Sequence, residues 1–299
     1  MLKQIQQIAC AERFQKRASQ RQERLSTLSS LISGAAVDPN SIETVERRQE
    51  RARLLTQASP PSPGKDFDNG RHILEAVVGR DDRLPRNFLT LGGRTADAIC
   101  RVATSTNTGE RSLGTGFAVA QGLILTNNHV LPTEAWAARG QIEFGYWSST
   151  PDPQQRRVTL ALDPGRFFLT DLRLDFTLVA FEERARDIIH KVFGSIDILP
   201  QSGKALIGEA VNVIQHGGGG PQTVSLRDNV VVDIFDDWLH YTSDTDEGAS
   251  GAPVLNDQWQ LAALHHAAFE YTAADGSRIL VNEGARISSI ARSIAGMLS

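Results

Sequence analysis

Cysteine is scarce in this chain: Cys10 and Cys100 are the only two among 299 residues. A secreted domain held together by disulfides would contain more, so both are expected to be buried or incidental thiols. Long apolar runs are also missing, because no stretch approaches the roughly 18 residues that a membrane-spanning helix needs. The opening residues lack the apolar core of a signal peptide. We therefore expect a cytoplasmic protein that does not enter a membrane.

No excess of charge of one sign marks the chain as a whole. Its net charge is −4 and 40% of its residues are hydrophobic, which is typical of a globular protein and gives no indication of nucleic acid or a membrane surface as partner. The average hides an asymmetry. Residues 1–58 hold ten Lys and Arg against six Asp and Glu, net +4, whereas the remainder holds 21 against 29, net −8. The basic segment is expected to bind another protein, a second copy of the chain, or the acidic remainder itself.

The basic segment has the pattern of two helices. Apolar residues recur at roughly helical spacing between residues 2 and 33 and again between 42 and 55. Asn40 and Glu43 have the spacing of a capping box at the start of the second helix. The pattern predicts a helical hairpin over residues 1–58, joined near Gly34. A solvated and partly frayed extension is the alternative, because so small a hairpin buries little core alone.

A proline-rich stretch separates this segment from the rest. Pro60, Pro61 and Pro63 cannot continue a helix, so residues 59–70 are predicted to be a linker. Beyond it, short β-rich runs alternate with Gly, Asn, Asp and Pro, which predicts an all-β domain over residues 71–299. The runs are residues 99–104, 116–120, 123–126, 158–162, 176–181, 210–215, 229–234, 252–255, 260–265 and 279–282. Isoleucines at 287, 290 and 294, followed by Leu298, predict a closing helix.

Three segments each place one reactive side chain beside an apolar strand. Residues 114–130 have the pattern of a hairpin that turns at Gln121-Gly122 and delivers His129 just after its second strand. Asp175 directly precedes an apolar run, and Ser250 lies among small residues. Taken singly, each has an ordinary explanation: a structural histidine, a turn aspartate and a small-residue β-turn.

The small residues around Ser250 suit a nucleophile that a substrate backbone must approach closely. Glycine on both sides permits backbone torsions that larger residues resist. Such a turn can direct the amide N–H groups of Gly248 and Ser250 at one point, which is the arrangement of an oxyanion hole.

Together, the three residues follow one another as His129, Asp175 and Ser250, which is the order of the chymotrypsin-type triad. Over roughly residues 74–290 the chain resembles trypsin-like serine peptidases, and in particular the bacterial glutamyl endopeptidase-like branch. The resemblance is carried by Gly114-Thr115-Gly116-Phe117, Leu125-Thr126-Asn127-Asn128-His129-Val130, Asp175-Phe176 and Gly248-Ala249-Ser250-Gly251-Ala252-Pro253-Val254, with weaker support from residues 77–83 and 263–266. It implies two six-stranded antiparallel β-barrels with a C-terminal helix.

The resemblance also implies roles. Ser250 would attack the scissile carbonyl, His129 would move the proton, and Asp175 would orient the imidazole. Asp171 is the nearest competing acid but lacks the directly following strand. No metal or organic cofactor is implied. Ala249 and Ala252 depart from the family's usual residues, although both remain small.

Two further residues match positions that line the specificity pocket in glutamyl endopeptidases. His265 lies fifteen residues after Ser250, and Thr245 lies five before it. The match predicts a preference for a protein or peptide substrate with Glu, or Asp, on the acyl side of the cut. The alternative is that His265 merely ends a core strand.

If Glu is accepted, the chain could cut itself between Glu75 and Ala76, at the place where secreted relatives begin. Two other functions stay open from the sequence. One is a non-catalytic binding module that keeps the fold, and the other is a regulatory protein acting through the N-terminal helices, which are expected to be separable from the β domain.

Overall fold

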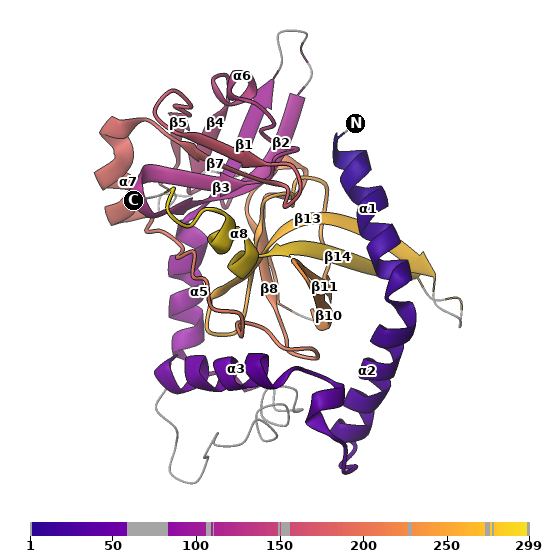
Figure 1. The fold of residues 1–299 in the computed structure, drawn as a ribbon. Coiled ribbons are helices and arrows are strands. Elements are labelled where there is room, and N and C mark those ends of the chain that lie inside the picture. Colours follow the sequence, from indigo (N-terminus) through magenta and orange to yellow (C-terminus); the bar gives the residue numbers. More distant parts are fainter. Residues whose placement is uncertain are drawn as a thin grey trace.

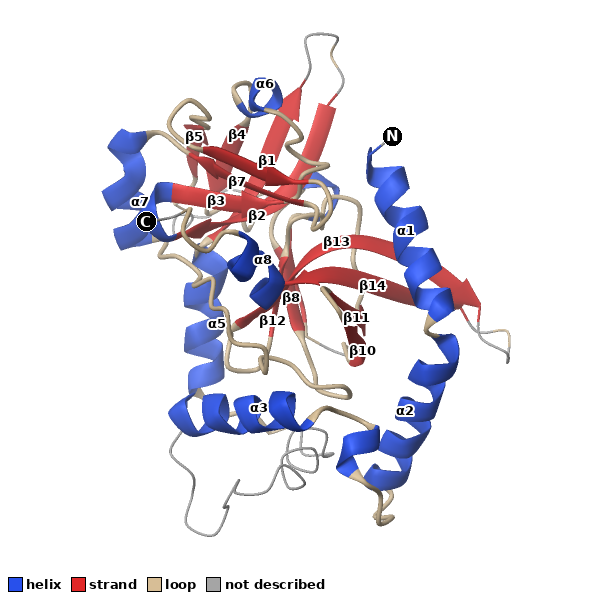
Figure 2. Cartoon of the chain, viewed as in Figure 1, coloured by secondary structure: helices blue, strands red, loops and turns tan. Residues whose placement is uncertain are grey.

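The computed structural model of the chain describes residues 2–58, 83–105, 109, 111–148, 150, 156–226, 229–272, 276 and 278–297. Two antiparallel sheets make up most of it, and helices at the start of the chain border the second sheet (Figures 1 and 2). Two interpretations made from the sequence, the linker over 59–70 and the cut between Glu75 and Ala76, lie outside the described residues.

The first sheet brings the histidine and aspartate segments together. Its strand order is β5-β4-β1-β2-β3-β7-β6. The strands are β1 (Ile99–Ser105), β2 (Arg111–Val119), β3 (Leu123–Thr126), β4 (Gln141–Phe144), β5 (Val158–Ala161), β6 (Phe168–Asp171) and β7 (Phe176–Ala180). Strands β2 and β3 form the predicted hairpin. Because Thr126 at the end of β3 pairs with Thr177 at the start of β7, His129 and Asp175 lie at the same end of the sheet.

The second sheet carries the serine segment. Its order is β10-β11-β14-β13-β12-β8-β9. The strands are β8 (Asn212–Gln215), β9 (Thr223–Ser225), β10 (Val231–Phe235), β11 (Trp238–Thr242), β12 (Pro253–Leu255), β13 (Leu261–Thr272) and β14 (Arg278–Arg286). Ser250 lies in the connection from β11 to β12, and β12 is held between β8 and β13.

The expectation of two six-stranded barrels needs correction. Each sheet has seven strands, and among the described residues neither set of pairings returns to its first strand to close a barrel. Four strands were missing from the sequence pattern, namely β4, β6, β9 and β11. Three of these, β4, β6 and β9, have only three or four residues, but the predicted strands β3, β5, β8 and β12 are as short, so length alone does not explain why they were missed. The predicted closing helix is present as α8 (Ile287–Ser293) but ends before Leu298.

The N-terminal segment forms three helices where the pattern predicted two. Helix α1 (Leu2–Lys16) and helix α2 (Ala18–Ile32) divide at Arg17, and helix α3 follows at Val45–Ala58. The capping-box interpretation is wrong. Asp38, whose side chain accepts from the amide of Asn40, caps a short 3-10 turn, η1 (Pro39–Ser41), and the Glu43 carboxylate accepts from the amide of Thr44.

These helices are packed into the second sheet rather than detached from it. Leu28, Leu31 and Ile42 belong to one buried cluster with Val213 and Leu239 of the sheet. Helix α1 also lies along β13. Apolar burial of this kind is worth about 25 cal/mol per Å², so we expect truncation at residue 65 to destabilise the second sheet, contrary to the separability expected from the sequence.

Ion pairs between the basic segment and the acidic sheet add to this packing. The buried carboxylate of Asp233 on β10 pairs with Arg17 at 2.6 Å and with Arg24 at 3.1 Å, and buried Arg51 of α3 pairs with Glu209. The basic segment therefore neutralises acids of its own chain. Its binding to a second protein or to another copy stays a prediction.

The remaining helices are short. They are α5 (Asn87–Asp97), α6 (Glu134–Ala137) and α7 (Arg186–Val192), with 3-10 turns η2 (Ala120–Gly122), η3 (Glu183–Ala185) and η4 (Gly217–Gly219). In the described part of the chain no helix combines the length and the apolar character that crossing a bilayer requires.

The packing of α2 predicts a contrast between two neighbouring residues. Leu31 is 7% exposed and Ile32 is 42% exposed. Leu31→Ala should lower the free energy of unfolding by about 2–5 kcal/mol, whereas Ile32→Ala should change it by no more than about 0.5 kcal/mol. Chemical denaturation of both variants checks this. Equal and negligible effects would mean that the helices are detached from the sheet.

Candidate active site

His129 and Asp175 are joined by two hydrogen bonds. The ring Nδ1–H of His129 donates to Oδ2 of Asp175 at 2.7 Å, and the backbone N–H of His129 donates to Oδ1 at 3.0 Å. The two bonds fix the position of the ring and leave its Nε2 as the nitrogen that can act on a substrate or nucleophile. Nε2 is buried and has no hydrogen-bond partner within the described structure.

The carboxylate of Asp175 is completely buried and yet ionised. Burial alone would raise the pKa of Asp175, but hydrogen bonds from His129 and His266 outweigh it and lower the pKa below its ordinary value. Its backbone has a φ of +50°, a conformation that costs a non-glycine residue energy. The side-chain amide of Asn127 donates to the Asp175 carbonyl at 2.8 Å and so helps to hold this conformation.

Asp171, the competing acid in the sequence, has a different role. Its Oδ1 accepts from the amides of Arg173 and Leu174 at 2.7 and 2.9 Å. This is the bonding of a turn-forming aspartate, and it leads the chain into the residue that holds His129.

The serine loop depends on two glycines. Gly248 and Gly251 have φ of +99° and +87°, which favours glycine. A Cβ on Gly251 would lie 2.1 Å from the carbonyl oxygen of Thr115, and one on Gly248 would lie 2.6 Å from the carbonyl oxygen of His216. Backbone of both sheets therefore closes around Ser250, which is 7% exposed.

Thr115 of β2 connects the serine loop to the first sheet. Its amide donates to the carbonyl of Ser250 at 2.8 Å, and its hydroxyl donates to the carbonyl of Gly248 at 2.8 Å. The same hydroxyl accepts from the amide of His216 at 2.9 Å. The motif Gly114-Thr115-Gly116 stood out in the sequence, but nothing there indicated that the threonine fixes the serine.

The candidate oxyanion donors are the amides of Gly248 and Ser250. The carbonyl of Glu247 accepts from the amide of Gly218. Because the C=O and N–H of a trans peptide point in opposite directions, the Gly248 N–H points away from that loop. Among the described hydrogen bonds neither Gly248 nor Ser250 uses its amide as a donor.

A cavity of about 680 Å³ lies over these groups. It is lined by both sheets and by the start of α1: Leu2, Lys3, Arg111, Ser112, Leu113, His129, Pro132, Thr133, Trp136, Gly218, Glu247, Gly248 and Ser250. Lys3 pairs with Glu247 across its rim at 3.0 Å. Ser250, the oriented His129 and the candidate oxyanion donor Gly248 therefore all line one cavity. These are the groups that nucleophilic acyl transfer requires.

The two predicted specificity residues do not line this cavity. His265 is buried, with its Nδ1 2.6 Å from the hydroxyl of Tyr241, and burial lowers the pKa of His265 to about 3. Thr245 donates its hydroxyl to Oδ1 of Asn282 at 2.6 Å. Both polar groups are therefore engaged within the protein, and the imidazole is neutral.

His266 is a site residue that the sequence did not single out. Its Nδ1 lies 3.2 Å from Oδ2 of Asp175, so Asp175 has a second imidazole partner. The register of β13 against β14 shifts between His265 and Ala267. Both consecutive histidines are buried, because every residue of β13 from Leu261 to Ala267 is buried and both faces of the strand are covered there.

Comparison with known families supports the fold and the chemistry. The model of the trypsin-like peptidase domain matches residues 114–264. Among solved structures, Deg5 superposes with a TM-score of 0.51 at 16% identity, covering 70% of this chain and 94% of that one. The serine endoprotease from Yersinia pestis has a TM-score of 0.50 at 18% identity and covers 72% and 68%. Similarity at this identity establishes the fold alone.

Two curated proteins are similar in sequence. Uncharacterized protein y4fB of Sinorhizobium fredii (strain NBRC 101917 / NGR234) is 35% identical over 243 residues, which cover 77% of this chain and 35% of that protein. Secreted RxLR effector protein 73 of Plasmopara viticola is 24% identical over 211 residues, covering 64% and 50%. The chain thus spans half or less of the length of either relative.

The closure around Ser250 predicts a large cost for one methyl group. Gly251→Ala should destabilise the fold by clearly more than the roughly 1–2 kcal/mol that a left-handed residue costs alone, because the new Cβ also meets the Thr115 carbonyl. Gly194 is the matched control, since it has φ +76° and no atom within 4 Å of its Cβ position. Denaturation curves for Gly251→Ala and Gly194→Ala compare the two. Equal losses would show that the serine loop tolerates a side chain.

Proposed function

Because the chain belongs to the family of trypsin-like peptidase domains, we propose that it is a serine endopeptidase whose triad is Ser250, His129 and Asp175. The observation that carries this proposal is the buried pair of His129 and Asp175, held by two hydrogen bonds, beside a cavity that Ser250 shares. A domain without this chemistry would have no need to align an imidazole on a buried carboxylate beside a serine-lined cavity.

The proposed reaction gives Ser250, His129 and Asp175 one role each. As the Ser250 hydroxyl attacks the scissile carbonyl carbon, its proton passes to Nε2 of His129, and Asp175 stabilises the resulting imidazolium. The oxygen that becomes negative is stabilised by the amides of Gly248 and Ser250. The C–N bond then breaks, the proton from Nε2 goes to the leaving amine, and water hydrolyses the acyl-enzyme by the same steps in reverse order.

For the substrate, we propose a preference for Glu or Asp on the acyl side of the cut, as in the glutamyl endopeptidase-like branch. With the Tyr241 hydroxyl donating to Nδ1 of His265, the ring proton is on Nε2, which can donate to a substrate carboxylate only where the cavity opens toward this buried ring. Because burial keeps His265 neutral, this hydrogen bond is worth about 0.5–1.5 kcal/mol rather than the larger value of a charged one. The cations that line the cavity, Lys3 and Arg111, favour acidic substrates as well.

The competing function is a non-catalytic binding module, and Ser250→Ala separates the two. The variant should unfold at the parent temperature, because one small buried residue replaces another, and lose several orders of magnitude in peptide hydrolysis. A fluorophosphonate probe should label the parent and not the variant. Ser243→Ala, at a buried serine outside the cavity, is the control and should be labelled. A folded parent that neither cleaves peptides nor reacts would favour the binding module.

The acidic preference has its own test. His265→Leu should reduce the ratio of kcat/KM for Glu over uncharged peptides by about tenfold at most, the worth of one neutral hydrogen bond. Tyr241→Phe retains the imidazole and should retain a preference for Glu. Equal rates for Glu and Lys peptides with the parent would contradict the proposed specificity, whatever the variants do.

A further inference from the structure

Behind Asp175 lies a second pair of buried charged groups. His266 directs Nδ1 at Oδ2 of Asp175 (3.2 Å) and Nε2 at Oε1 of Glu283 on β14 (2.8 Å). Both ring nitrogens thus face a carboxylate oxygen. An imidazole can donate from both nitrogens only when it is protonated, so the geometry itself calls for an imidazolium between two carboxylates.

Glu283 is in turn held by the N-terminal helix. It is completely buried, and Arg13 of α1 donates from Nε to both its oxygens at 2.9 and 3.1 Å, with a further contact from the guanidinium. The Arg13 guanidinium also lies 4.1 Å above the ring of Trp238. That ring stacks on His266 with centroids 4.8 Å apart. Arg13 therefore reaches His266 by two routes, a carboxylate and an aromatic ring.

The charge state of His266 agrees with this geometry. Burial opposes its charge, but the hydrogen bonds that it donates to Asp175 and Glu283 outweigh burial and raise the pKa of His266 to about 8. Burial would raise the pKa of Glu283, but hydrogen bonds from Arg13, His240 and His266 lower it well below its ordinary value. The groups that face His266 or its two carboxylates come from every surrounding element: Arg13 and Cys10 of α1, His240 of β11, Glu283 of β14, His265 of β13, and His129 with Asp175 of the first sheet.

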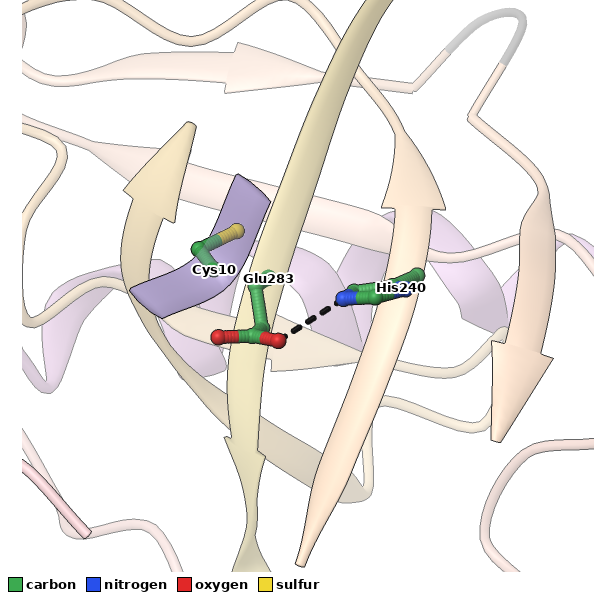
Figure 3. A group of neighbouring side chains, drawn as sticks. All are labelled: Cys10, His240 and Glu283. Carbon is green, nitrogen blue, oxygen red and sulfur yellow. Dashed lines mark hydrogen bonds and ion pairs between the residues drawn. The ribbon is translucent and has the colours of Figure 1, made fainter. Parts of the chain in front are cut away.

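Three of these groups could in principle bind a metal ion. Figure 3 shows Cys10 and His240 on either side of Glu283, and their ligand atoms lie within 4.8 Å of one another. However, the oxygens of Glu283 already accept from Arg13, His240 and His266. A cation here would have to displace, or lie against, the partly exposed guanidinium of Arg13. The donor set fits an ion-pair network better than a metal centre.

We propose that His266 is a positioning residue for Asp175, and that Arg13 of helix α1, acting through Glu283, sets how firmly it holds that carboxylate. Helix α1 then contributes to the position of Asp175, and displacing the helix would weaken the hydrogen bond between His266 and Asp175. This inference rests on the proposed peptidase function.

Deprotonation of His266 determines how kcat is expected to depend on pH. His266 keeps its proton below about pH 8 and loses it above, so at higher pH one carboxylate must lose its donor and Asp175 becomes less well held. We expect kcat to fall as pH rises through about 8. Arg13 partly neutralises Glu283. Without Arg13, Glu283 attracts the His266 proton more strongly, and the fall should move to higher pH.

The test compares Arg13→Gln with Arg17→Gln. Arg17 is an apt control, because it also bonds a buried acid, Asp233, and lies 4.4 Å over the ring of Phe235, but among the described contacts makes none with Asp175, His266 or Glu283. Both variants loosen the helix. Arg13→Gln should move the alkaline limb of kcat upward by about one pH unit with KM little changed, whereas Arg17→Gln should superimpose on the parent. Arg13→Lys, which restores the charge, should bring the limb back toward its parent position.

His266→Ser supplies the second comparison, since a serine hydroxyl donates at every pH. Its profile should lack the alkaline limb near pH 8. Thermal unfolding of each variant establishes that it is folded. Indistinguishable profiles for Arg13→Gln and Arg17→Gln, or a limb that persists in His266→Ser, would overturn the proposal.

A readout without turnover keeps this proposal separate from the peptidase function. In the Ser250→Ala background, an NMR titration of the histidine side chains reports the pKa of His266 directly. It should be about 8 and should rise on Arg13→Gln but not on Arg17→Gln. If the protein hydrolyses no peptide yet His266 titrates in this way, the proposed function fails while the coupling holds. If the enzyme is active but the pKa of His266 does not change on Arg13→Gln, the peptidase function holds and the proposed coupling fails.

Discussion

The constraint on which the site depends is the burial of one carboxylate. Asp175 is removed from water, so its negative charge is stable only if donors surround it. His129 supplies two of them, and His266 supplies a third from the other sheet. The need to satisfy this charge ties together a strand end of the first sheet and a bulge in the second. It also explains why a conformation as unfavourable as φ +50° persists at Asp175.

A second constraint concerns how Ser250 is held relative to His129. Ser250 and His129 come from different sheets, and a small sliding of one sheet would separate them. Thr115 prevents this by bonding the backbone of Ser250, Gly248 and His216 from within β2. Since Gly251 brings its backbone against the Thr115 carbonyl, the contact between the sheets is made by backbone atoms and by one buried hydroxyl.

The sequence predicted the parts of this site that are local and missed those that depend on pairing. The hairpin before His129, the strand after Asp175 and the glycines around Ser250 each have a short-range pattern, and all three recur in the structure. His266, Glu283 and Arg13 have none, because they meet only through a bulge, a neighbouring strand and a helix some 270 positions away in the chain. The sequence pattern also missed the short strands β4, β6 and β9. It did not predict the packing of α2, because the apolar face of an amphipathic helix does not reveal which element covers it.

The packing of the N-terminal helices explains why the sequence has both a basic N-terminal segment and an acidic β domain. Glu283 and Asp233 are acids buried under α1 and α2, where Glu283 pairs with Arg13 and Asp233 pairs with Arg17 and Arg24. The charge asymmetry is therefore the signature of an internal interface. Helix α1 contributes Leu2 and Lys3 to the wall of the cavity at one end, and at the other end Arg13 bonds Glu283, the partner of His266. A ligand that displaced this one helix would open the cavity and remove a partner of Glu283 at the same time, so under the proposed function its two effects would occur together.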